Sequence, residues 1–187
     1  MKDFDFVFAL YGLLLGLSLT EVLGGLARVI EARLRPDATM RIGWLTPLMA
    51  AFLLLDLLSF WASAWLVRDQ VVVSNRSLLA VTAFASAYYL TATLAFPREP
   101  ATLASLDEHY FSVRRLVLGV MLALLLCQIG WYLSIPPIAA RLMRPVTLGA
   151  TVLLATLMGT AIAVRGERWS RAALIALVAR DFLIYVL

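Results

Sequence analysis

Four ionisable residues lie inside long apolar stretches of this sequence: Glu21, Asp56, Arg180 and Asp181. A charged side chain at the centre of a bilayer costs about 2.5–3.5 kcal/mol or more, so it needs a partner or water to persist. Because Asp56 and Arg180 are expected at similar depths, we predict an ion pair between them. Arg28 follows Glu21 by about two helical turns, which predicts contact through water rather than directly.

Hydroxyl side chains accompany these charges at helical spacing. Ser59 follows Asp56 by about one helical turn, and two hydroxyl side chains share the face of the first apolar stretch that carries Glu21. The hydroxyl groups that we place beside the charges are Tyr11, Ser18, Ser59 and Tyr89. We interpret the whole set as the lining of a hydrated path or a proton relay. The alternative is that the charges form structural ion pairs that only fix the helix register.

The surrounding sequence is typical of a protein solvated by lipid. Of its 187 residues, 63% are hydrophobic and 15% are charged, against about 45–50% and about 25% in average soluble domains. A hydrocarbon core of about 30 Å takes about 20 residues of helix to cross. Six stretches reach this length, at residues 4–30, 42–67, 78–96, 113–133, 146–164 and 169–187. We therefore predict an all-α fold, a polytopic integral membrane protein whose single domain, residues 1–187, is a six-transmembrane-helix bundle.

Small residues form a row along the first predicted span. They recur at every fourth position, and they are Gly12, Gly16, Thr20 and Gly24. Such a row lets a second helix approach closely in lipid, either within the bundle or between subunits. Six helices are few to enclose both four buried charges and a pathway across the membrane. We therefore expect a homo-oligomer, with a dimer favoured.

Basic residues are distributed unevenly between the two sides of the predicted bundle. The connections after the first, third and fifth spans, with their flanking ends, hold the larger group: Arg28, Arg33, Arg35, Arg41, Arg98, Arg114, Arg115, Arg165, Arg168 and Arg171. The opposite side holds Lys2, Arg68, Arg76, Arg141 and Arg144. Since the side richer in Lys and Arg is cytoplasmic, we predict a bacterial inner (plasma) membrane protein with both termini outside. The same rule accounts for the net charge of +4 without nucleic acid as a partner.

The sequence offers few residues for metal or covalent chemistry. It has one cysteine, Cys127, and one histidine, His109, which cannot supply a disulfide framework, a Cys/His metal site or a bis-histidine haem site within one chain. Asp107, Glu108 and His109 fall in a predicted cytoplasmic loop, which we interpret as solvated. No metalloprotease motif, nucleophile elbow or phosphate-binding glycine loop occurs. We expect no catalytic residue, no metal and no cofactor.

Three functional hypotheses follow from these observations. The first is an ion or proton channel or transporter with intramembrane acidic residues on its pathway, whose partners are the lipid bilayer and a small ion or proton. The second is a non-transporting membrane subunit or assembly factor. The third is a membrane enzyme acting on a lipid or quinone. A polar cavity that reaches Asp56 or Glu21 would favour transport, whereas dry enclosure of these residues would favour the second hypothesis.

Overall fold

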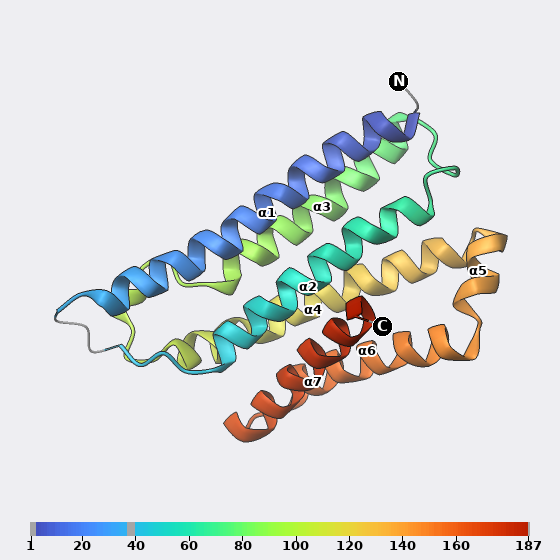
Figure 1. Cartoon of the computed structure of the whole chain (residues 1–187). Helices are drawn as coiled ribbons and strands as arrows, with labels where there is room; N and C mark the ends of the chain where they lie inside the picture. Colours follow the sequence, from blue (N-terminus) through green and yellow to red (C-terminus); the bar gives the residue numbers. More distant parts are fainter. Residues whose placement is uncertain (1–2, 37–39, 187) are drawn as a thin grey trace.

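The computed structural model describes residues 3–36 and 40–186, in which every regular element is a helix. The elements are α1 (Asp3–Leu34), α2 (Leu45–Leu66), α3 (Asn75–Ala95), the short 3-10 helix η1 (Pro100–Thr102), α4 (Leu106–Leu133), α5 (Pro136–Leu142), α6 (Pro145–Ala163) and α7 (Glu167–Val186). Figure 1 shows α1 to α4 running along one another, with α5 joining α4 to α6 at one end of the bundle. The predicted all-α fold is confirmed.

Five of these helices are long and apolar enough to cross a membrane: α1, α2, α3, α4 and α6. They make the chain a helical integral membrane protein. Helix α7 covers the sixth predicted span but is not one of the five. Its apolar residues are interrupted by Arg171, Arg180 and Asp181.

Helix α4 begins at Leu106, earlier than the predicted span, because the residues before it form a good helix start. The Ser105 hydroxyl oxygen accepts a hydrogen bond from the Asp107 backbone N–H at 3.2 Å. Asp107 and Glu108 lie in the first helical turn, where negative charge complements the helix dipole. The predicted loop over these residues is therefore wrong, since apolar periodicity alone does not detect a polar first turn.

The same turn holds the start of α2. The Asp107 carboxylate accepts a hydrogen bond from the Leu45 N–H at 2.9 Å, and the Thr46 hydroxyl donates to the Leu106 carbonyl at 2.8 Å. Gly43 has no room for a side chain, because an added Cβ would overlap the Asp107 carboxylate. Asp107 thus satisfies a backbone N–H at the N-terminus of α2 that has no partner within the helix, and it fixes that end of the bundle.

Helix α1 packs most extensively against α3 and less against α2, and α7 packs against α2 and α6. The contact between α1 and the end of α3 is close at Gly25, where an added Cβ would overlap the Phe96 ring. By contrast, a Cβ on Gly12 or Gly16 would meet no atom within 4 Å, and one on Gly24 would meet only Arg28 of the same helix. Within the described residues, the predicted small-residue row therefore lies open beside the α1–α3 contact.

We predict that Gly25→Ala destabilises the protein by about 1–3 kcal/mol, because the new methyl group forces the Phe96 ring out of its packed position. The matched change Gly16→Ala, on the open face of α1, leaves stability unchanged or slightly raised. Thermal unfolding of both variants in detergent measures the difference. Equal stability of the two variants would show that the α1–α3 contact at Gly25 is looser than described.

Candidate functional site

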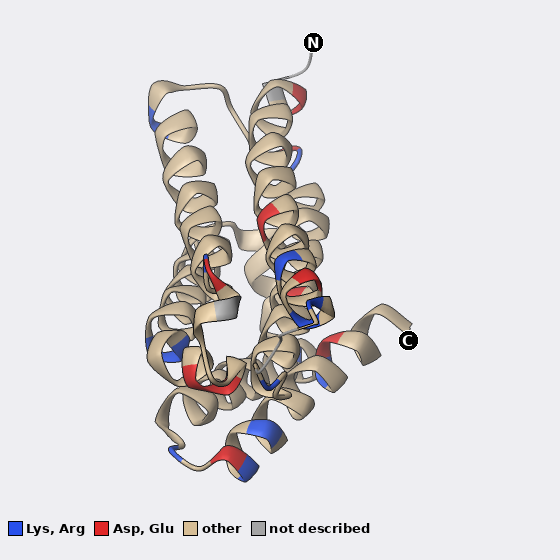
Figure 2. Ribbon diagram, turned by 90° about the vertical axis from the view of Figure 1, so that its left-hand side faces the viewer, with Lys and Arg blue, Asp and Glu red and all other residues tan. Residues whose placement is uncertain are grey.

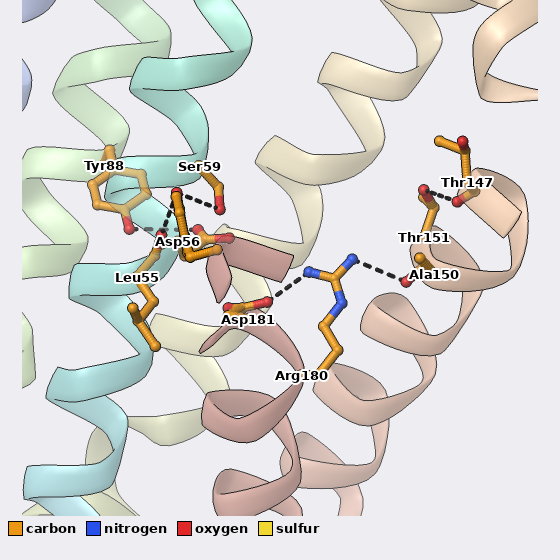
Figure 3. A network of polar contacts seen from close by, with 10 residues as sticks. Leu55, Asp56, Ser59, Tyr88, Thr147, Ala150, Thr151, Arg180 and Asp181 are labelled. Carbon is orange, nitrogen blue, oxygen red and sulfur yellow. Dashed lines mark hydrogen bonds and ion pairs between the residues drawn. The ribbon is translucent and has the colours of Figure 1, made fainter. Parts of the chain in front are cut away.

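The site is a cluster of buried polar side chains between α2, α3, α6 and α7, which we call the charge cluster: Asp56, Tyr88, Arg180 and Asp181 (Figure 3). Asp56 is 6% exposed and Asp181 is 1% exposed. Asp181 continues the face of α7 that buries Leu174 and Leu177, so the packing of α7 against α2 carries its carboxylate inward. Three of the four residues were identified from the sequence, and Tyr88 was not.

Arg180 forms its ion pair with Asp181, its neighbour on α7, rather than with Asp56. The guanidinium Nη1 lies 2.5 Å from the Asp181 Oδ1, and Nη2 donates to the Ala150 carbonyl of α6 at 3.0 Å. Figure 3 shows the Arg180 side chain directed toward α6, away from α2. The predicted Asp56–Arg180 ion pair is therefore wrong, because equal depth does not determine the direction in which a long side chain extends.

Asp56 has a tyrosine rather than an arginine as its nearest polar neighbour. The Tyr88 hydroxyl donates to the Leu53 carbonyl at 2.7 Å and lies 3.4 Å from the Asp56 Oδ2. Asp181 and Arg180 also lie close enough to act on the Asp56 carboxylate, the first by repulsion and the second by attraction. Two enclosed carboxylates thus share one enclosed guanidinium. The Asp181 Oδ2 has no hydrogen-bond partner among the described residues.

Two hydroxyl groups that the sequence placed here lie near the cluster. The Ser59 Oγ lies 3.1 Å from the hydroxyl of Tyr185, which also lies 3.4 Å from the Leu55 carbonyl. Tyr11 of α1 lies near Asp56 and Tyr88 but forms no hydrogen bond with either among the described residues. Ser59 and Tyr11 thus border the cluster on α2 and α1.

The remaining predicted residues lie apart from the cluster. Ser18 is buried, but its hydroxyl donates to the Leu14 carbonyl of its own helix at 2.9 Å. Tyr89 is half-buried, whereas its neighbour Tyr88 is fully buried in the core. A signal for Tyr88 does exist in the sequence, because it lies in register with the small buried residues of α3: Ala85, Ala92 and Ala95.

Glu21 has its own partner on α1. The Arg28 Nη2 lies 3.9 Å from the Glu21 Oε2, and 41% and 33% of the two side chains are exposed. The prediction that two helical turns prevent direct contact is wrong, since both long side chains extend toward each other along the helix. Within the described chain, Glu21 shares no hydrogen bond or ion pair with the charge cluster.

A cavity of about 720 Å³ lies between α1, α2, α3 and α4. Its lining includes Tyr11 but none of Glu21, Asp56, Arg180 and Asp181. The charge cluster is therefore enclosed by packed helices, with Tyr11 between it and the cavity.

Comparison with known proteins adds no assignment: no family model, curated protein or solved structure matches this chain.

We predict strong coupling between Arg180 and Asp181. Asp181→Asn alone removes the only carboxylate in direct contact with the Arg180 guanidinium among the described residues and costs about 3–5 kcal/mol. Adding Arg180→Gln recovers most of that loss, because no unpaired charge remains. Unfolding of the two single variants and the double variant in detergent measures the coupling energy.

The exposed pair Glu167–Arg171, at 2.6 Å on the same helix, is the matched control. Its coupling should be only about 0.3–0.5 kcal/mol, since water screens an exposed pair. Additive losses at Arg180 and Asp181 would contradict the structural ion pair.

Proposed function

We propose that this chain carries protons across the membrane, with Asp56 and Asp181 as the central proton-binding groups. The observation that carries the proposal is the charge count of the cluster: two enclosed carboxylates and one enclosed guanidinium. One negative charge has no counter-charge within the cluster, and a bound proton is the smallest group that neutralises it. Uptake and release of that proton would switch the cluster between neutral and charged.

The first hypothesis covers transport of a small ion as well as of a proton. The surroundings of the cluster support a proton more than a metal cation. Metal cations such as Ca²⁺ require six or more oxygen ligands. Within the part of the chain that the structure describes, no group of three His, Cys, Asp or Glu side chains could hold a metal ion. A proton needs only a series of neighbouring hydroxyl groups and carboxylates. Tyr88 supplies a hydroxyl group beside Asp56, and Ser59 and Tyr185 supply a second pair of hydroxyl groups near the cluster.

We also propose that α7 lies at membrane depth as the sixth membrane segment. Its charged residues near the C-terminal end face the protein, since Asp181 is buried and 16% of the Arg180 side chain is exposed. The residues that follow are apolar and exposed, as expected of a surface in contact with lipid: Phe182, Leu183 and Ile184. A helix of this kind can lie at membrane depth even though its composition falls short of a typical span.

The orientation also remains part of the proposal. The connections α1–α2, α3–α4 and α6–α7 lie at the end of the bundle away from the N-terminus, where charged residues gather (Figure 2). Their arginine content supports a cytoplasmic location for this end, with the N-terminus outside, in a bacterial inner membrane. Helix α7 ends beside the bundle rather than at the end that holds the N-terminus (Figures 1 and 2), so the predicted outside location of the C-terminus has no support from this arrangement. The open row of Gly12, Gly16, Thr20 and Gly24 supports a homodimer, since no described helix packs on Gly12 or Gly16.

A second candidate function is a non-transporting membrane subunit. It is favoured by the enclosure of Asp56, which the cavity does not reach, and by the direct bonds that the cluster makes between helices. Tyr88 joins α3 to the Leu53 carbonyl of α2, and Arg180 joins α7 to the Ala150 carbonyl of α6. The unmatched negative charge of the cluster is the observation that favours proton transport over this function. In this function the charges hold α7 in place and carry nothing.

Proton flux into liposomes separates the two functions. In a protein that folds normally, Asp56→Asn should lower flux by about tenfold or more, because an amide cannot take up and release a proton. Glu167→Gln, which removes an exposed carboxylate of α7, should leave flux near the wild-type value. Absence of flux in the wild type, or equal flux in Asp56→Asn, would contradict transport and favour the second function.

A further inference from the structure

The cavity between α1 and α4 is lined by neutral side chains. It lies where the first turns of α1 meet the end of α2, the start of α3 and the end of α4. Among the residues that the structure describes, its lining contains no Asp, Glu, Lys, Arg or His. Its volume of about 720 Å³ falls within the range of about 300–1,000 Å³ that is usual for small-molecule sites. A charged ligand would find no counter-charge there, so the lining selects a neutral one.

Aromatic rings form much of the cavity wall. Phe4 and Phe8 stack with their centroids 5.0 Å apart, and Phe84, Trp131 and Tyr132 line other sides. Flat apolar walls of this kind complement a ring, which they contact by stacking or edge to face. The expected ligand therefore has a ring on an apolar body.

A fixed group of polar atoms occupies one part of the wall. The Gln128 Nε2 donates to the Ser63 hydroxyl at 2.7 Å and to the Tyr132 hydroxyl at 2.9 Å. The Tyr132 hydroxyl in turn donates to the Ser63 carbonyl at 3.2 Å. These bonds fix the amide plane of Gln128 and use both of its donors, so its carbonyl oxygen is the atom that remains to accept.

Among the partly buried side chains of the lining, two polar atoms are thus available to a ligand, whereas the Gln70 amide, which also lines the cavity, is exposed. Neither the Gln128 carbonyl oxygen nor the Tyr11 hydroxyl forms a hydrogen bond within the described residues. The carbonyl oxygen can only accept, while the hydroxyl can donate or accept. A ligand hydroxyl group matches both, because it can donate to Gln128 and accept from Tyr11. Leaving such groups without partners in an apolar site costs free energy that a bound hydroxyl would recover.

We propose that this cavity binds a neutral, ring-bearing membrane molecule through a hydroxyl group held between Tyr11 and Gln128. A quinol has this chemistry, and so does a lipid alcohol with a fused aliphatic ring. The site is separate from the charge cluster, since neither carboxylate of the cluster lines it. It therefore stands whether or not the protein carries protons.

Binding to the purified protein in detergent tests the proposal. The probes are a short-chain benzoquinol, its quinone, a cyclic aliphatic alcohol and the matching cyclic hydrocarbon, measured by titration calorimetry. The hydroxyl-bearing probes should bind more tightly than the quinone and the hydrocarbon, since only a hydroxyl donates to the Gln128 carbonyl. Preference for the quinol over the alcohol would identify the ligand as a quinol, and the reverse would identify a cyclic alcohol.

Two variants and one control test whether the probes bind in this cavity. Tyr11→Phe should weaken binding of the preferred probe by about fivefold to tenfold, the effect of one hydrogen bond. Tyr89→Phe, which removes a tyrosine hydroxyl outside the cavity, is the matched control and should bind as the wild type does. Ala80→Phe should weaken binding, because Ala80 lines the cavity and a phenyl ring there takes space that the ligand needs. Binding that is equal for all four probes, that is absent, or that survives Ala80→Phe unchanged would overturn the proposal.

Discussion

The enclosure of two carboxylates with one guanidinium is the constraint on which the interior of this protein depends. An uncompensated charge in an apolar bundle is costly, so every element that contributes a charge must also find polar contacts for it. Arg180 meets this requirement by pairing with Asp181 and by donating to the Ala150 carbonyl, which ties α7 to α6. Tyr88 supplies the corresponding bond between α3 and α2, beside Asp56. The packing of α7 is thus as much a consequence of its charges as of its apolar face.

Polar groups in this bundle are divided between two regions of different chemistry. The charge cluster is enclosed and contains the ionisable groups, whereas the cavity is lined by neutral and aromatic side chains. Tyr11 is the residue of α1 that borders both, because it lines the cavity and lies near Asp56. The first turns of α1 therefore belong to the cavity wall. Further along the helix, Gly25 contacts Phe96, and Glu21 pairs with Arg28.

The sequence was sufficient to predict the helical membrane class, because span length and hydropathy depend on composition rather than on packing. It also identified Asp56, Arg180 and Asp181, since an ionisable residue in an apolar stretch stands out without a structure. It could not predict their partners, which depend on the rotation of each helix about its axis. Tyr88 and Tyr89 are adjacent, yet only Tyr88 faces the core. The cavity could not be predicted from the sequence either. It is formed where four helices meet, and the pattern of one helix does not encode its contacts with the others.

Infrared spectroscopy of the protein in liposomes at neutral pH tests most directly whether the charge cluster holds a proton. A protonated carboxyl group absorbs apart from an ionised carboxylate, so it can be recognised in the spectrum and assigned by substitution. The account predicts a protonated-carboxyl band in the wild type that is lost or shifted in Asp56→Asn and in Asp181→Asn, and is kept in Glu167→Gln. A wild-type spectrum without such a band, or a band that neither substitution changes, would contradict proton binding by the enclosed carboxylates.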